Sequence, residues 1–265
     1  MLRRTLDRNR QLLWPTARGF AHGVLQRRSE FRHHVVREAW TVAKRFSAEH
    51  VENIELREIP SVYDIKVEGW VDDYQRLVVS ALAQGLGCRT CFEIGTSSGR
   101  TSWMLARADP QMQVFTLDLP ENVRPEETEF ALGADDCNFL RRPSCGHAFW
   151  NTPEAERITQ LEGDSATFDF SPWRNTIDFV YVDGAHTYDY VRSDTENAFR
   201  LLSPTGTIAW DDYTTGAGVF EFISEFAPTL EGTIYHVFGT RMVLYSRQNF
   251  VRRLPFTDFT SIPAV

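Results

Sequence analysis

The feature that most constrains the fold is a regular alternation of short apolar runs with longer amphipathic segments between residues 89 and 245. Such alternation favours an α/β domain with a mainly parallel sheet and helices on both faces. We expect strands at residues 89–94, 113–117, 157–161, 178–182, 207–210, 233–238 and 241–245, and helices at residues 74–86, 99–108, 187–202 and 219–226. The last two strands form a hairpin-like pair, which predicts an antiparallel strand at the end of the sheet.

The run Ile177–Val182 is typical of a central parallel strand that is buried on both faces. Asp183-Gly184-Ala185-His186 follows it directly. Because ligands of open α/β sheets bind beyond the carboxyl ends of the strands, Asp183 and His186 are candidates for a functional site. The alternative is that Asp183-Gly184 forms only a turn and that His186 opens the next helix.

A glycine turn, Glu93-Ile94-Gly95-Thr96-Ser97-Ser98-Gly99, follows the first expected strand. A P-loop requires GxxxxGK[ST] and a dinucleotide site requires GxGxxG, and the turn matches neither pattern. Glu93 disfavours a phosphate ligand and attracts a cationic one, while Gly95 lets the backbone approach a ligand closely. Asp118 ends the second strand, where an acid accepts hydrogen bonds from ribose hydroxyls. A cationic, adenosine-bearing ligand without phosphate is S-adenosylmethionine.

Five motifs stand in order at the ends of the expected strands: EIGTSSGRT at 93–101, DLP at 118–120, GDS at 163–165, VDGAH at 182–186 and DDY at 211–213. In these motifs, residues from about 88 to 246 resemble the class I S-adenosylmethionine-dependent methyltransferases, and more narrowly a bacterial family within them. The resemblance implies a Rossmann-like sheet of seven strands. It also implies a cofactor site made of Glu93, Gly95, Thr96, Ser97, Ser98, Gly99, Asp118, Leu119, Gly163, Asp164, Ser165 and Asp183. In that site Gly95 to Ser98 wrap the methionine moiety, Asp118 holds the ribose, and Asp164-Ser165 lie at the adenine.

Three acids follow two strands that we expect to be neighbours: Asp183 after one, and Asp211-Asp212 after the other. Converging carboxylates repel one another unless a cation neutralises them, and Mg²⁺ prefers such oxygen ligands. The arrangement is similar to metal-dependent O-methyltransferases of the catechol, caffeoyl-CoA and macrolide-sugar types, whose metal acids match Asp183, Asp211 and Asp212. The alternative is that Asp211-Asp212 only cap and turn the chain before the next helix.

The resemblance also implies a mechanism. His186 matches the base of the macrolide-sugar enzymes, so His186 and Asp183 form the expected catalytic pair. Mg²⁺ would lower the pKa of an acceptor hydroxyl, and His186 would remove its proton before methyl transfer. Metal-free N- or C-methylation, the cephalosporin hydroxylation linked to similar folds, and a non-catalytic adenosyl-binding or scaffold protein stay open as alternatives.

The chain divides into an N-terminal helical extension (1–70), the methyltransferase-like domain (71–250) and a C-terminal tail (251–265). Residues 120–156 interrupt the alternation. They are expected either as a lid over a small-molecule acceptor, with the aromatic side chains of Phe149 and Trp150 suited to it, or as a surface insertion with small helices of its own.

Charge is distributed unevenly along the chain. Residues 1–50 hold eleven Lys or Arg against four Asp or Glu, and the remainder holds seventeen against thirty-two. An acidic main domain argues against nucleic acid as a partner. The basic extension, with apolar residues at helical spacing, suits docking on the main domain or a homodimer.

The N-terminus lacks a signal-peptide core and no run is long enough to span a membrane, which favours a cytoplasmic protein. The pair Cys88 and Cys91 resembles half of a zinc site, but no second half follows it. We therefore expect both to be core thiols.

Overall fold

The computed structural model describes residues 70–140, 145–213, 218–232, 234–237 and 240–248. Its longer helices are α4 (Trp70–Gly85), α5 (Arg100–Ala108), α6 (Ala134–Phe139), α7 (Tyr188–Leu201) and α8 (Gly218–Phe226). Its strands are β1 (Thr90–Ile94), β2 (Gln113–Asp118), β3 (Ile158–Glu162), β4 (Ile177–Val182), β5 (Leu202–Trp210), β6 (Tyr235–His236) and β7 (Val243–Ser246). The predicted C-terminal tail and all of the predicted N-terminal extension except Trp70 lie outside the described residues.

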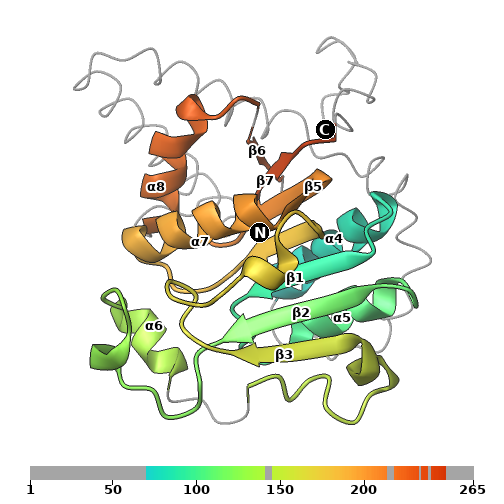
Figure 1. Cartoon of the computed structure of the whole chain (residues 1–265), viewed down its shortest axis with the longest axis horizontal. Helices are drawn as coiled ribbons and strands as arrows, with labels where there is room; N and C mark the ends of the chain where they lie inside the picture. Colours follow the sequence, from blue (N-terminus) through green and yellow to red (C-terminus); the bar gives the residue numbers. More distant parts are fainter. Residues whose placement is uncertain (1–69, 141–144, 214–217, 233, 238–239, 249–265) are drawn as a thin grey trace, which may run out of the picture.

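One sheet joins all of these strands in the order β3-β2-β1-β4-β5-β7-β6 (Figure 1). The pairs from β3 to β5 are parallel, whereas β7 runs antiparallel to both β5 and β6. Six of the strands have four or more residues, and β6 is a two-residue seventh. The mostly parallel, Rossmann-like sheet with an antiparallel final strand is therefore confirmed.

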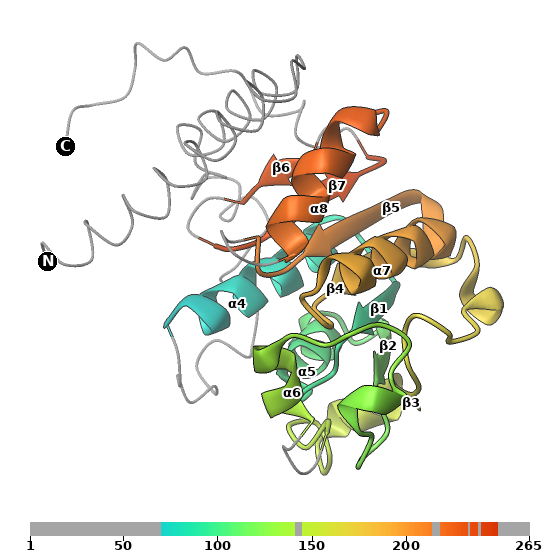
Figure 2. The ribbon, with the colours of Figure 1, turned by 90° about the vertical axis from the view of Figure 1, so that its left-hand side faces the viewer.

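Helices cover both faces of the sheet, because successive residues of the central strand β4 enter two different cores. Val180 and Val182 pack with apolar residues of α7 and α8, whereas Phe179 and Tyr181 pack with those of α4 and α5. Figure 2 shows α7 and α4 on opposite sides of the sheet. Cys88 and Cys91 are buried in the second of these cores as free thiols, which confirms the prediction for them.

The main error in the predicted elements lies between α7 and β5. The helix ends one residue early, at Leu201, and the strand begins at Leu202 rather than at Thr207. Leu202 already pairs with Ile177 of β4, ahead of a register shift. Pro204 and Gly206 conceal this half of the strand in the sequence, because both residue types are depleted in strands.

The described part of residues 119–157, between β2 and β3, contains three short helices: the 3-10 helices η3 (Pro125–Glu127) and η4 (Pro153–Arg157), and α6 between them. The arrowheads of β2 and β3 point toward the side on which α6 lies, so the insertion sits at the carboxyl edge of the sheet (Figure 1). Within the described ranges, no helix combines the length and apolarity needed to cross a membrane.

Candidate active site

A cavity of about 610 Å³ opens at the carboxyl edge of the sheet. Its volume is typical of sites that hold small molecules and cofactors. With the exception of Gly99, every residue predicted for the cofactor, the metal or catalysis lines it: Glu93, Gly95, Thr96, Ser97, Ser98, Asp118, Leu119, Gly163, Asp164, Ser165, Asp183, His186, Asp211 and Asp212. The fold thus brings five separate strand ends to one cavity.

The two glycines of the turn after β1 serve close packing within the protein. Gly95 has a φ of 100°, and a β-carbon on it would lie 2.0 Å from the carbonyl oxygen of Asp183. Gly99 is the N-cap residue before α5 and has a φ of 82°, and a β-carbon on it would collide with Phe149 and Gly146. The sequence predicts that the backbone at Gly95 lies close to a ligand. In the structure, Gly95 lies close to the backbone that follows β4.

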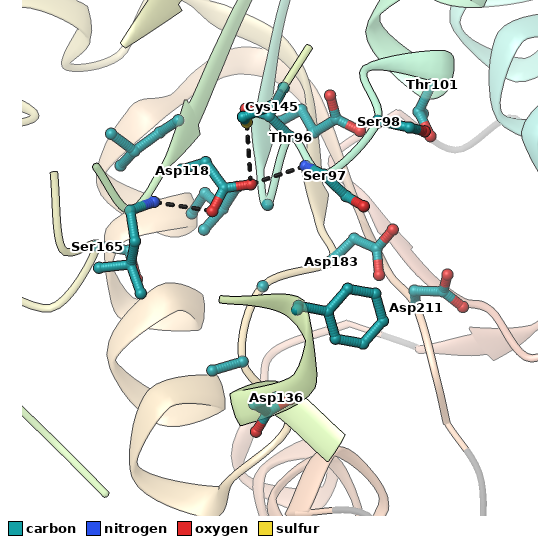
Figure 3. Close-up of a pocket in the computed structure, with 18 of the residues that line it drawn as sticks. Thr96, Ser97, Ser98, Thr101, Asp118, Asp136, Cys145, Ser165, Asp183 and Asp211 are labelled. Carbon is teal, nitrogen blue, oxygen red and sulfur yellow. Dashed lines mark hydrogen bonds between the residues drawn. The ribbon is translucent and has the colours of Figure 1, made fainter. Parts of the chain in front are cut away.

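Asp118 lies where the sequence predicts a ribose-binding acid. Its Oδ2 accepts a hydrogen bond of 2.7 Å from the backbone N–H of Ser97, and its Oδ1 accepts one of 2.8 Å from Leu119 (Figure 3). The Cys145 thiol, from the insertion, lies 3.5 Å from the same Oδ2. These contacts hold the carboxylate at the wall of the cavity.

Glu93 is too deeply buried to attract a ligand from solvent by its charge. Glu93 is 1% exposed, and its carboxylate accepts hydrogen bonds from the hydroxyls of Ser102 and Thr116. Burial raises the pKa of Glu93 to about 7, although these hydrogen bonds oppose the rise. Its negative charge is therefore only partly present at neutral pH.

Asp164 joins three parts of the chain. Its Oδ2 accepts hydrogen bonds of 2.8 Å from the Glu129 backbone N–H and from the Tyr190 hydroxyl, and its Oδ1 accepts one from Ala166. Because both oxygens are engaged, the Asp164 carboxylate anchors the insertion and α7. Its neighbour Ser165 lines the cavity beside it.

Asp183, His186 and Asp212 form the one group in the described part of the chain whose donor atoms suit a metal ion, since these atoms lie within 4.8 Å of one another. Desolvation and the charges of Asp211, Asp212 and Glu93 raise the pKa of Asp183 well above its usual value. Among the described residues, no side chain or backbone group donates a hydrogen bond to its carboxylate. A cation would relieve this crowding of negative charge.

His186 lies between two carboxylates. Its Nδ1 is 2.5 Å from Oδ1 of Asp136, and its Nε2 is 2.8 Å from Oδ2 of Asp212. Burial alone would lower the pKa of His186, but the hydrogen bonds to Asp136 and Asp212 outweigh it and raise the pKa to about 10. Arg241 pairs with Asp212 at 3.0 Å, so cationic and anionic side chains alternate around the site.

The pair Asp211-Asp212 is split by the structure. Asp212 adopts a φ of 51° and faces His186, whereas Asp211 is 9% exposed and accepts hydrogen bonds from Gln75 of α4 and Tyr181 of β4. The Tyr181 hydroxyl lies 3.0 Å from Asp211 Oδ2. Asp211 thus ties α4 to the sheet, and Asp212 is the acid of this pair that joins the metal-suited group.

The sequence did not identify Asp136, Gln75 and Arg241 as site residues. Asp136 stands 50 residues before His186, and Gln75 stands 136 residues before Asp211. No spacing rule links such distant positions. Phe149 and Trp150, the aromatic side chains expected to suit an acceptor, do not line this cavity: Phe149 is buried against Gly99 and Trp150 is 46% exposed.

The insertion is bound to the site at several strand ends. The backbone N–H groups of Gly146 and Ala148 donate to the carbonyls of Ser97 and Ser98, at 2.8 and 2.9 Å. Together with the contacts of Glu129 and Asp136, these bonds fasten the insertion beside β1, β3 and β4.

Comparisons with known proteins agree with this architecture. Residues 92–213 match a family model described as a methyltransferase domain, which supports a methyltransferase. No curated protein sequence matches the chain.

The similar solved structures described here are distant from the chain. They include the O-methyltransferase TomG from Streptomyces achromogenes in complex with SAM (18% identity, 82% of this chain and 97% of that one, TM-score 0.46). An O-methyltransferase from Bacillus cereus in complex with SAH is also similar (18%, 75% and 90%, 0.42), as is a methyltransferase from Geobacter sulfurreducens (16%, 76% and 89%, 0.43).

Proposed function

We propose that this protein is an S-adenosylmethionine-dependent methyltransferase that methylates a hydroxyl group of a small molecule with the help of a divalent cation, Mg²⁺. One observation carries the proposal: a single cavity holds a ribose-type acid beside a glycine turn and, at neighbouring strand ends, the group Asp183, His186 and Asp212. The acid and the glycine turn suit an adenosyl cofactor. The group Asp183, His186 and Asp212 suits an acceptor hydroxyl that must lose a proton.

The cofactor would occupy the half of the cavity between β1 and β3. Asp118 has both oxygens at the cavity wall, where ribose hydroxyls can donate to them. Gly163 and Ser165 line the side expected to hold the adenine, and Thr96 to Ser98 line the side expected to hold the methionine. Bound S-adenosylmethionine supplies an electrophilic methyl carbon.

The residues present fit a divalent cation. Asp183 offers a carboxylate that receives no hydrogen bond within the described ranges, and Asp212 offers a second one nearby. Both are oxygen donors, as Mg²⁺ prefers, and their number leaves positions for water and acceptor oxygens. A cation bound there would lower the pKa of the acceptor hydroxyl.

His186 is the base in this proposal. In the structure its Nε2 lies 2.8 Å from Asp212 Oδ2, and the contacts with Asp136 and Asp212 raise its pKa, which favours the protonated ring in this state. With Asp212 engaged as a ligand of a bound cation, Nε2 of a neutral His186 would be free to accept the hydroxyl proton. The remaining contribution of the site is to hold the acceptor oxygen in line with the methyl carbon.

The acceptor side of the cavity is partly apolar. Leu132, Phe139 and Leu140, from α6 and its flanks, line it together with the acids, and Phe139 is 43% exposed. These side chains suit an acceptor that carries an apolar or aromatic portion next to its hydroxyl.

Calorimetry with S-adenosylhomocysteine and Mg²⁺ tests the proposal, followed by mass spectrometry of a panel of catechols and other hydroxylated aromatics incubated with methyl-labelled S-adenosylmethionine. We expect binding of both ligands and label on oxygen that is lost with chelator. Cofactor binding with methylation that ignores chelator would instead indicate metal-free N- or C-methylation. Absence of cofactor binding would indicate a scaffold protein.

A further inference from the structure

Asp136 is a buried carboxylate that the insertion places against the proposed base. It lies on α6 and is 7% exposed, and acids are seldom buried so deeply unless they are paired. Its Oδ1 meets Nδ1 of His186 at 2.5 Å, and both of its oxygens lie 3.3 Å from the backbone nitrogen of the same residue. The carboxylate therefore contacts His186 at two points.

A carboxylate at each ring nitrogen fixes the orientation of the imidazole: Asp136 at Nδ1 and Asp212 at Nε2. A carboxylate can only accept, so Nδ1 of His186 must carry a proton. Nε2 faces the Asp212 carboxylate in the structure and donates to it in the same way. Once the imidazole is neutral and keeps its proton on Nδ1, Nε2 is the nitrogen that accepts. Catalytic bases are oriented in this way by a third group in many hydrolases.

Asp136 also stabilises the start of α6, a structural role that is distinct from its contact with His186. Its Oδ2 accepts a hydrogen bond of 2.9 Å from the backbone N–H of Gly133 and so caps α6. The cap requires one oxygen, which an asparagine also provides. The contact with Nδ1 requires an acceptor there, and an asparagine amide in that place would donate instead.

We propose that Asp136 is the positioning residue of His186: it holds the proton on Nδ1 and keeps Nε2 facing the site formed by Asp183 and Asp212. The consequence for activity rests on the proposed function, whereas the orientation of His186 does not. The insertion then supplies part of the catalytic apparatus, because α6 must be seated on the end of β4 before His186 has its working orientation.

The test compares Asp136→Asn with Asp135→Asn, since Asp135 is the exposed neighbour on the same helix. In protein labelled with ¹⁵N-histidine, we expect a downfield Nδ1–H resonance, assigned by its loss in His186→Gln. The resonance should persist in Asp135→Asn and disappear in Asp136→Asn. The affinity for S-adenosylhomocysteine should change by no more than about twofold in either variant, because both positions lie outside the part of the cavity proposed for the cofactor.

Kinetics with an acceptor from the labelled panel complete the test. Asp136→Asn should lower kcat by about 10²- to 10⁴-fold with little change in KM, as for loss of the correct tautomer of a base. A persistent Nδ1–H resonance in Asp136→Asn, or its loss without any fall in kcat, would overturn the inference. If the parent protein methylates nothing, the proposed function fails, and the resonance alone still decides whether Asp136 orients His186.

Discussion

The carbonyl oxygen of Asp183 lies 2.0 Å from the point where a β-carbon on Gly95 would stand. The turn after β1 and the end of β4 are thus packed backbone against backbone. The Asp183 backbone N–H also donates to the carbonyl of Ile94 at 2.8 Å. The turn that we propose for the cofactor and the acid that we propose for the metal are therefore packed together, and a change at one should alter the other.

Gly95→Ala should destabilise the protein by about 3–5 kcal/mol, since it combines a left-handed φ with a collision against backbone. Gly87→Ala is the matched control, because Gly87 has a φ of 70° with nothing within 4 Å. It should cost only roughly 1–2 kcal/mol. Urea unfolding measures both, and equal losses would show that the contact with Asp183 is unimportant.

Asp211 and Asp212 should differ in their effect on Mg²⁺ affinity. Asp212→Asn removes a proposed ligand and should weaken Mg²⁺ binding at least about tenfold. Asp211→Asn should affect stability more than Mg²⁺ affinity, because the Asp211 carboxylate accepts hydrogen bonds from Gln75 and Tyr181. Calorimetric titration with Mg²⁺ separates the two variants. Equal losses of affinity would restore the three-acid metal site that the sequence predicts.

Much of this site could be predicted because the acids stand at strand ends, and strand ends are visible in a sequence. Asp118, Asp183 and Asp212 each follow an apolar run, and a parallel sheet brings such ends to one edge. The separate roles of Asp211 and Asp212 could not be predicted, because alternation alone does not show which of two adjacent acids turns inward.

The residues that support the acids were not predictable, because neither the pattern of their own segment nor any spacing shows which acid they contact. Gln75 accepts a hydrogen bond from the Arg241 backbone N–H across 166 positions, and Asp136 sits in an irregular insertion. Only the packing of α4 and α6 on the sheet brings these side chains to the site. For Asp136, the sequence contains only an Asp-Asp pair after a glycine.

Asp194 should make stability depend on pH. It is fully buried on α7, and burial raises its pKa to about 7. In the unfolded chain its pKa is about 4, so the folded state binds the proton more tightly. This contribution to stability is therefore present at low pH, falls as the pH rises from about 4 to about 7, and is constant above that.

Asp194→Asn removes the ionisation, so its stability relative to the parent protein should rise between pH 5 and pH 8, by on the order of 2–4 kcal/mol. Asp189→Asn, at an exposed position on the same helix, should show no such trend. Urea unfolding at the two pH values supplies the comparison. A difference between Asp194→Asn and the parent that does not vary with pH would mean that Asp194 stays in one protonation state.

His186→Ala tests the division of the cavity into a cofactor half and a chemical half. His186 contacts Asp136 and Asp212 but none of the residues around Asp118, so its loss should leave S-adenosylhomocysteine affinity nearly unchanged. Turnover should fall about 10²- to 10⁴-fold, which is the usual contribution of a general base. His147→Ala is a useful comparison, because His147 lines the same cavity and lies next to the Gly146 contact with the cofactor turn. That variant should weaken cofactor binding more than His186→Ala does. A parallel loss of cofactor affinity and turnover in His186→Ala would assign His186 to the structure of the site and leave the proton of the acceptor to another group.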